Sequence, residues 1–333
     1  MKVAFITKGG FEDGMGHIYS TLTLAKYISN GAVVRFFTGG DNIAIKKIRE
    51  NNFEVIETKN IEEIIEKINK LKPDTIVVDL PLMSEEFIKS LKNKDPKAKL
   101  IVFGNILVNI PPNVDEYCDV VINYNFGSGN FESRKYIDKK TGTLFLQGPR
   151  YLILRPEFYN CKKTYRTTNL RRILIIFGGA DPSNLTSQVL DKLLQTHYDF
   201  NIGVVLGPNF GFYNKIVDIL ERHKEKKERV KIYKDVENVA TLMYNTDLVI
   251  TSPGLSMFEA LYIGVPTIAI CQNNLQKRAY KDFTFVYDKQ CIQELDKLVF
   301  TFYKLFPKII DEMKIEIGDG KEEVIEEILE VKE

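Results

Sequence analysis

The chain has 333 residues, of which 44% are hydrophobic and 27% are charged. This length suits two domains of about 150 residues each, and the composition is that of a globular protein with substantial cores. Lysine plus arginine (46) nearly equals aspartate plus glutamate (45), which leaves a formal net charge of +1. No long-range field therefore favours a nucleic-acid or lipid partner, and any bound anion must be held locally.

Cysteines and apolar runs indicate a soluble, cytoplasmic protein. Cys118, Cys161, Cys271 and Cys291 form no CxxC motif, so we expect four reduced, buried thiols. The opening KVAFIT is too short for the apolar region of a signal peptide and runs straight into glycines. The longest apolar run, at 100–112, is shorter than the ~20 residues of a spanning helix and ends in proline.

The first third of the chain alternates short β-rich runs with longer helical patterns. Nearly continuous apolar strands between helices are typical of a parallel sheet that is covered on both faces. The predicted strands are 3–7, 32–38, 53–57, 74–80, 99–105 and 119–125.

A glycine-rich turn, TKGGFEDGMGHI, follows the first predicted strand and opens into a helix. Glycines allow a tight turn and a close backbone approach, and the start of a helix attracts anions. The spacing matches neither the dinucleotide fingerprint nor a P-loop, so we predict no nicotinamide or ATP site. A purely turning role is the alternative, but it leaves unexplained why His17, one of three histidines, ends this turn.

After Asn125 the pattern lapses through residues rich in glycine, arginine and lysine, where we expect the connection between domains. The alternation then restarts, with predicted strands at 172–179, 201–207, 229–235, 247–254 and 266–272. We therefore expect an α/β protein of two doubly wound, Rossmann-like domains that face each other across a cleft. The expected division is residues 1–150, a linker at 151–170 and a second domain at 171–333, whose last helix is free to pack on the first domain.

Two further turns in the second half suit a diphosphate. In IIFGGADPSNLT, Gly178 and Gly179 follow a buried strand, and Asp181, Ser183 and Asn184 are good helix caps. A purely structural turn is an equally open alternative there.

The last of these turns lies in ITSPGLSMFEALYIGVP, where Ser252 can cap the helix or donate to a phosphate. Glu259 follows in the helix. Its carboxylate would match a ribose diol, although a solvated surface position is the default for glutamate. Together, the three turns and this carboxylate describe a nucleotide-diphosphate-sugar site.

Four segments carry a resemblance to known proteins. SPGLSMFEALYIGVPTIAI resembles the nucleotide-sugar segment of MurG-type glycosyltransferases, which have the GT-B fold. Together with GMGHIYSTLTLAKYI, LILRPEFY and FGGADPSNLT it more closely resembles the PseG family, hydrolases of UDP-2,4-diacetamido-2,4,6-trideoxy-β-L-altropyranose in the pseudaminic acid pathway. Related proteins are the spore-coat polysaccharide proteins of the SpsG type. The resemblance extends roughly from Lys2 to Gln276.

The resemblance implies a role for individual residues. His17 would be the catalytic base that activates water. The nucleotide and diphosphate would lie against Gly178, Gly179, Ser252, Gly254, Leu255, Ser256 and Glu259. The expected residues around the sugar are Gly14, Gly16, Tyr19, Asp79, Asn274 and Gln276. Two departures concern the sugar half: Leu275 precedes Gln276 where the family has asparagine, and the His/Tyr pair expected near Leu80 and Pro81 is absent.

A single base is chemically sufficient for this hydrolysis. Ordinary glycosidases need two carboxylates, but a nucleotide diphosphate is a good leaving group whose charge backbone amides can stabilise. A neutral imidazole with a pKa of ~6.5 can take the proton of the attacking water. Direct attack inverts the anomeric centre and needs no metal or cofactor. Asp13 is a candidate to orient the imidazole, with a plain turn role as the alternative.

The leading hypothesis is therefore an inverting, metal-independent UDP-sugar hydrolase of nonulosonic acid biosynthesis. The alternatives are a GT-B glycosyltransferase that uses a UDP-sugar donor for a surface polysaccharide, and a non-catalytic nucleotide-sugar-binding protein. The expected partner is the UDP-sugar, without nucleic acid or an integral membrane segment. A monomer is favoured.

Overall fold

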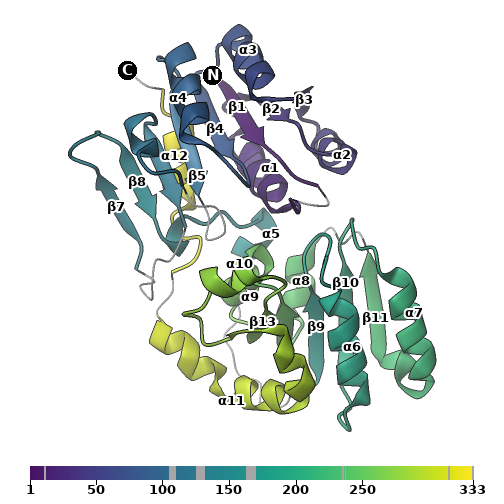
Figure 1. Cartoon of the computed structure of the whole chain (residues 1–333). Helices are drawn as coiled ribbons and strands as arrows, with labels where there is room; N and C mark the ends of the chain where they lie inside the picture. Colours follow the sequence, from purple (N-terminus) through teal and green to yellow (C-terminus); the bar gives the residue numbers. More distant parts are fainter. Residues whose placement is uncertain are drawn as a thin grey trace. The chain divides into compact units, whose positions relative to one another are not determined.

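The computed structural model describes residues 1–10, 13–104, 110–124, 132–162, 170–234, 236, 238–313 and 316–331. The chain divides into two compact units (Figure 1). Unit 1 comprises Met1–Ile153 and Ile315–Glu333, and unit 2 comprises Leu154–Lys314.

Within the described residues, unit 1 is built on an eight-stranded sheet with the order β3-β2-β1-β4-β5-β6-β8-β7. Its strands are β1 (Lys2–Thr7), β2 (Val33–Thr38), β3 (Glu54–Glu57), β4 (Thr75–Asp79), β5 (Lys99–Gly104), β6 (Val120–Asn123), β7 (Arg134–Ile137) and β8 (Leu144–Gln147). Neighbouring strands are parallel except for the antiparallel pair β7–β8. From β1 the chain first builds outward to β2 and β3, then crosses to β4 on the other side. Open α/β sheets bind ligands at such a switch point.

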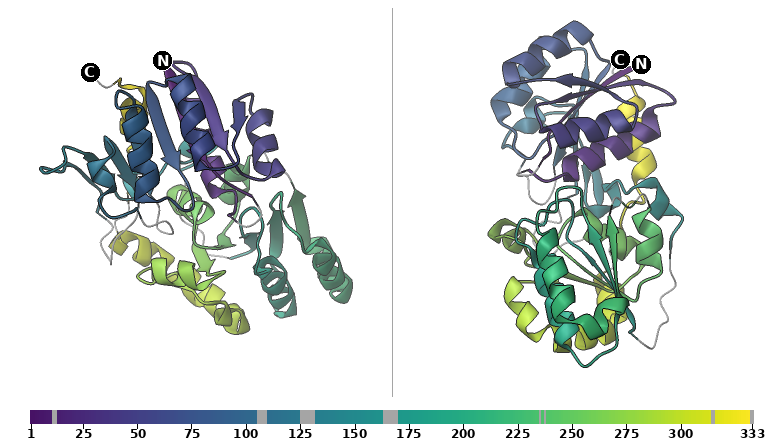
Figure 2. Two further views of the ribbon diagram at one scale, coloured as in Figure 1. Left: turned by 45° about the horizontal axis from the view of Figure 1, so that its top comes forward. Right: turned by 90° about the vertical axis from the view of Figure 1, so that its right-hand side faces the viewer.

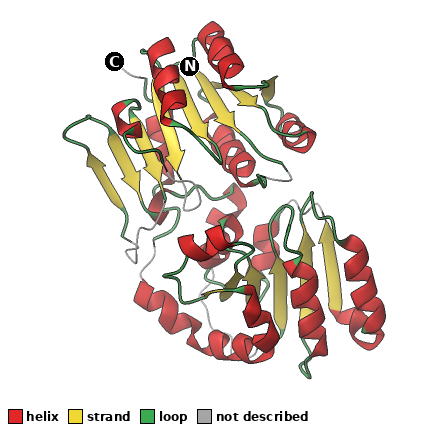
Figure 3. Cartoon of the chain, viewed as in Figure 1, coloured by secondary structure: helices red, strands yellow, loops and turns green. Residues whose placement is uncertain are grey.

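Helices cover both faces of this sheet, as the views in Figures 2 and 3 show. Alternate strand residues supply two separate cores. Val3 and Phe5 belong to the core under α1, α2 and α12, whereas Ala4 and Ile6 belong to the core under α3 and α4. These helices are α1 (Gly16–Ile28), α2 (Asn42–Glu50), α3 (Ile61–Leu71), α4 (Glu85–Lys94) and α12 (Lys321–Leu329).

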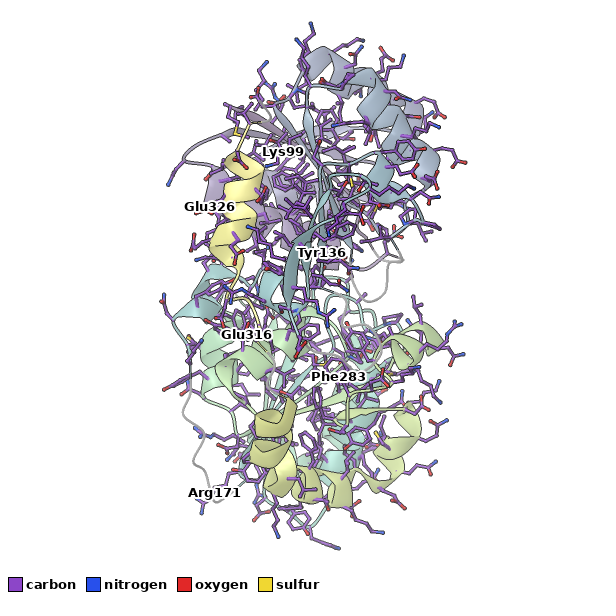
Figure 4. The ribbon with its side chains drawn as sticks, turned by 90° about the vertical axis from the view of Figure 1, so that its left-hand side faces the viewer. Lys99, Tyr136, Arg171, Phe283, Glu316 and Glu326 are labelled. Atoms are coloured by element: carbon purple, nitrogen blue, oxygen red, sulfur yellow. The ribbon has the colours of Figure 1, made fainter. Side chains whose placement is uncertain are left out.

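The last helix, α12, packs on the part of unit 1 formed by Met1–Ile153, although the whole of unit 2 separates the two in sequence. Val324 and Ile328 are fully buried in the unit 1 core, and the Thr75 hydroxyl donates to the Ile328 carbonyl at 3.0 Å. The nearly buried Lys99 ammonium donates to Glu327 at 2.9 Å. Figure 4 labels Lys99 beside the yellow helix. Residues 316–331 thus belong with unit 1.

The structure corrects the expected connection after Asn125. β7 and β8 form a hairpin at the edge of the unit 1 sheet, joined by a turn in which the Asp138 carboxylate accepts from the Lys140 and Thr141 amides. All four residues of β7 are exposed, so the strand carries no apolar alternation that would identify it. Of the expected linker, the first three residues belong to unit 1 and residues from Leu154 belong to unit 2, while 163–169 lie outside the described residues.

Unit 2 contains, among its described residues, a six-stranded parallel sheet with the order β11-β10-β9-β12-β13-β14. Its strands are β9 (Arg172–Ile176), β10 (Asn201–Leu206), β11 (Val230–Lys234), β12 (Leu248–Thr251), β13 (Thr267–Ile270) and β14 (Val286–Tyr287). The sequence pattern did not predict β14, which has only two residues. The switch point of this sheet lies between β9 and β12.

The unit 2 helices follow the expected alternation except for α5, which lies in the expected linker. They are α5 (Pro156–Tyr159), α6 (Leu185–Gln195), α7 (Tyr213–Arg222), α8 (Val239–Tyr244), α9 (Leu255–Ile263), α10 (Asn274–Ala279) and α11 (Leu295–Met313). In the described part of the chain, no helix combines the length and apolarity that crossing a membrane requires.

Candidate functional site

The glycine-rich turn after β1 has a geometry that explains its glycines. The Gly10 amide donates to the Gly14 carbonyl at 2.9 Å, and Gly14 has φ +73°, a conformation that favours glycine. A Cβ at Gly9 would lie 2.4 Å from a side-chain carbon of Ile18. At Gly14 and Gly16 a Cβ would meet no atom of the described residues within 4 Å.

His17 lies in the first turn of α1, beside the end of β4. Thr7, the last residue of β1, is in register with Asp79, the last residue of β4. This pairing brings Asp79 Oδ1 to 2.6 Å from His17 Nδ1. Asp79 is 1% exposed, and among the described residues its Oδ2 has no hydrogen-bond partner. The carboxylate is therefore directed to the imidazole.

The contact with Asp79 fixes what the imidazole can do. A carboxylate can only accept, so Nδ1 carries the proton that it donates to Asp79. Nε2 of the neutral ring is then left as the basic nitrogen, as in other histidine–carboxylate pairs. The His17 side chain retains 11% exposure. This arrangement suits a general base.

The pKa of His17 departs from the ordinary value of ~6.5 that we expected. Burial by itself would lower this pKa, but the charge and hydrogen bond of Asp79 outweigh burial and raise it, with a further contribution from the charge of Asp13. The Asp13 carboxylate pairs with Lys8 at 2.9 Å. Asp79, which we expected near the sugar, is the carboxylate in hydrogen-bond contact with the imidazole.

We expect Asp79→Asn to move the pKa of His17 from above ~6.5 to below it. The substitution removes the carboxylate that raises the pKa, whereas burial, which lowers it, remains. The three histidines make an imidazole NMR titration readily assignable. Asp13→Asn should give a smaller downward shift. An Asp79→Asn variant that titrates at the wild-type pH would contradict the pairing.

Tyr19 is not brought beside His17. It packs against the core between α1 and α2, with the Lys47 ammonium 6.0 Å from its ring centre. Residues two apart on a helix do not face each other. A place for Tyr19 beside a sugar stays a prediction.

In unit 2, the beginning of α9 is the more open of the two expected anion sites. Gly254 precedes the helix with φ +152°, no described side chain caps the helix, and its first turn has no acidic residue. A Cβ at Gly254 would meet no atom within 4 Å in the part of the chain that the structure describes. Leu255 and Ser256 form the first turn, so their amides lie at the positive end of the helix dipole.

The beginning of α6 is closed to an anion by the protein itself. The Asp181 carboxylate accepts from the amides of Leu185 and Thr186 at 2.9 and 2.8 Å, and Asp181 is 2% exposed. Burial raises its pKa despite these bonds. The Gly178–Gly179 backbone lies close to Gly207, the residue after β10, where a Cβ would lie 2.3 Å from the Gly178 oxygen. A Cβ at Gly178 itself, with φ +76°, would meet no described atom within 4 Å. The amides of Leu185 and Thr186 are therefore not available to the diphosphate that we expected at this turn.

Gln276 and Asn274 differ in their surroundings. Gln276 is 8% exposed, and both ends of its amide bond the backbone: Oε1 accepts from the Gln272 amide at 2.7 Å and Nε2 donates to the Pro253 carbonyl at 2.9 Å. Asn274 begins α10 and is exposed. Gln272 donates from its side-chain amide to the Phe177 carbonyl and the Ser252 hydroxyl oxygen, both at 3.3 Å. It was not predicted as a site residue, and its position directly after a buried parallel strand is the signal that could have identified it.

Glu259 is not the solvated carboxylate considered from the sequence. It is 0% exposed, and its two oxygens accept from Nε and Nη2 of Arg155 at 2.7 and 2.9 Å. Arg155 also lies over the Phe158 ring and 3.7 Å from Glu157. Burial raises the pKa of Glu259, and the Arg155 charge opposes that effect. A ribose could reach this carboxylate only if the atoms that cover it moved.

Sequence relatives place the chain in a family. It is 30% identical over 293 residues to the spore coat polysaccharide biosynthesis protein SpsG of Bacillus subtilis, covering 85% of this chain and 81% of SpsG. The chain belongs to the SpsG family. No family model matches it.

Two other relatives of this SpsG-family chain are informative. An uncharacterized protein of Methanocaldococcus jannaschii is 41% identical over 99% of this chain, which spans 66% of that protein's length. The UDP-2,4-diacetamido-2,4,6-trideoxy-β-L-altropyranose hydrolase of Campylobacter jejuni is 26% identical over 81% of this chain and 92% of the hydrolase.

Solved structures confirm the GT-B fold for this SpsG-family chain. MurG of Acinetobacter baumannii has a TM-score of 0.64 at 12% identity, covering 98% of this chain and 99% of MurG. The UDP-GlcNAc 2-epimerase of Neisseria meningitidis, solved with UDP-GlcNAc, has a TM-score of 0.60 at 13% identity, covering 99% of this chain and 100% of the epimerase. At these identities the similarity concerns the fold.

Proposed function

We propose that the chain is a UDP-sugar hydrolase that releases UDP from a UDP-2,4-diacetamido-2,4,6-trideoxyhexose in nonulosonic acid biosynthesis. The observation that carries this proposal is the His17–Asp79 pair at the switch point of unit 1, a base with a buried partner that fixes its tautomer. The names of the B. subtilis and C. jejuni relatives, which concern polysaccharide biosynthesis and this hydrolysis, support it.

In the proposed reaction, unit 1 supplies the base. A water oxygen attacks the anomeric carbon, its proton passes to Nε2 of His17, and the bond from that carbon to the β-phosphate oxygen breaks. The products are the free sugar, inverted at the anomeric centre, and UDP. Asp79 stabilises the imidazolium that forms. The raised pKa of His17 means that activity rises with pH as the imidazole loses its proton.

Unit 2 is proposed to hold the nucleotide. The amides at the beginning of α9 and the Ser252 hydroxyl would bind the diphosphate, where they stabilise the charge of the leaving group. Glu259 is proposed to accept from the ribose hydroxyls after a local rearrangement. Gly14, Gly16 and Asn274 remain proposed neighbours of the sugar, since their surroundings are open or exposed.

A GT-B glycosyltransferase is the second candidate. The same imidazole nitrogen that takes a proton from water can take one from an acceptor hydroxyl, and the fold is shared with MurG. The two functions differ only in the nucleophile.

The deciding experiment incubates the chain with UDP-2,4-diacetamido-2,4,6-trideoxyhexoses without an acceptor and follows UDP release. The proposal predicts multiple turnovers that survive EDTA and yield the free, inverted sugar. Turnover that requires an added acceptor would identify a transferase. UDP-sugar binding without turnover under either condition would identify a binding protein.

A further inference from the structure

Gln272 joins the loops at the switch point of the unit 2 sheet. It follows β13, and its Nε2 donates to the Phe177 carbonyl, after β9, and to the Ser252 hydroxyl oxygen, after β12, both at 3.3 Å. The Ser183 hydroxyl donates to the Gln272 carbonyl at 2.8 Å. One side chain and its backbone thus connect the ends of three neighbouring strands.

Gln276 completes this arrangement from the first turn of α10. Its Oε1 accepts from the backbone amide of Gln272, and its Nε2 donates to the carbonyl of Pro253. Asn273 fixes the turn between the two glutamines, because its side chain accepts from the Gln276 amide at 2.9 Å. The loop after β13 and the Ser-Pro-Gly turn before α9 are therefore held together.

The orientation of each glutamine side-chain amide is fixed by backbone groups that can only donate or only accept a hydrogen bond. Backbone carbonyls accept and backbone N–H groups donate, so Nε2 of each glutamine must face the carbonyl of Phe177 or Pro253. The Ser252 oxygen then accepts from Gln272 and keeps its own proton for another acceptor. Ser252 is partly exposed, so its hydroxyl can donate this proton to a bound ligand.

We propose that Gln272 and Gln276 are positioning residues of the nucleotide site, and that Gln276 is not a ligand of the sugar. Gln272 directs the Ser252 hydroxyl toward the diphosphate, and Gln276 holds the Ser-Pro-Gly turn that precedes α9. This inference rests on the proposed binding of UDP by unit 2. It differs from the role that the resemblance implies for Gln276, because both ends of that amide are used internally.

The test measures UDP and uridine affinity of the full chain by calorimetry. Gln276→Glu is nearly isosteric but places a carboxylate oxygen against the Pro253 carbonyl, and Gln272→Asn withdraws the amide from Ser252. We expect UDP affinity to fall at least tenfold in both variants while uridine affinity changes less than threefold. General destabilisation of unit 2 would weaken both ligands alike, so the UDP-to-uridine ratio reports on the diphosphate.

The matched control is Gln195→Glu, because Gln195 is an exposed glutamine at the last position of α6. The UDP affinity of this variant should equal that of the wild type. Unchanged UDP affinity in Gln276→Glu, combined with a higher KM for the UDP-sugar, would make Gln276 a sugar ligand and overturn the inference. If Gln276→Glu does not fold, Gln272→Asn decides by the same ratio. Absence of UDP binding in the wild type would instead refute the proposed function, and the inference with it.

Discussion

His17→Ala should lower kcat for UDP release about 10²–10⁴-fold, the usual contribution of a positioned general base. The imidazole is the proposed acceptor of the water proton, and Asp79 holds it in the tautomer that leaves Nε2 basic. The remaining rate would come from stabilisation of the leaving diphosphate by unit 2. Acceptor-free UDP release, measured under saturating UDP-sugar, gives kcat directly.

The matched control for this substitution is His223→Ala. This histidine also pairs with an aspartate, at 3.0 Å from Asp191, but on the surface formed by α6 and α7. It should keep wild-type kcat. UDP affinity should be unchanged in His17→Ala, because unit 2 is the proposed binding site of the nucleotide. Wild-type turnover by a folded His17→Ala protein would remove the imidazole from the mechanism.

Arg155→Met should destabilise the protein by about 3–5 kcal/mol, since it leaves the fully buried carboxylate of Glu259 without its cation. The double variant Arg155→Met/Glu259→Met should recover most of this loss, because no buried charge is left unpaired. Urea unfolding of the wild type, Arg155→Met, Glu259→Met and the double variant gives the coupling energy. A double variant no more stable than Arg155→Met would show that the ion pair is not the cause.

The pH dependence of this deficit has a definite sign. Burial already raises the pKa of Glu259, and loss of Arg155 removes the charge that opposes the rise. The folded variant therefore takes up a proton more readily than the unfolded chain, whose glutamate titrates near 4.3. Its stability relative to the wild type should improve as the pH falls toward that value and worsen as the pH rises.

The proposed ribose contact needs a separate readout, because a purely structural Glu259 would also affect stability. Comparing UDP with 2′-deoxy-UDP isolates one hydroxyl. If Glu259 accepts from the ribose, the wild type should prefer UDP, and folded Glu259→Gln should lose part of that preference. An equal preference in both proteins would leave Glu259 with the structural ion pair alone.

The sequence by itself determined the two-domain α/β architecture and the positions of most strands. Continuous apolar runs such as VAFIT are read correctly because parallel strands are buried on both faces, so hydrophobicity alone marks them. The glycine-rich turn before His17 was equally visible, since glycine is required where the backbone adopts φ +73° at Gly14. Both signals depend only on neighbouring residues, so they can be recognised without knowledge of the fold.

Only the tertiary structure decided which side chains act together. Asp79 lies 62 residues from His17 and Arg155 lies 104 residues from Glu259, and strand order or segment packing brings each pair together. The exposed strand β7 escaped prediction because its four residues show no apolar alternation. Pairing between distant residues depends on sheet register and burial, and neither can be read from composition or spacing. The turns could therefore be found from the sequence. The partners of His17, Glu259 and Gln276 could not.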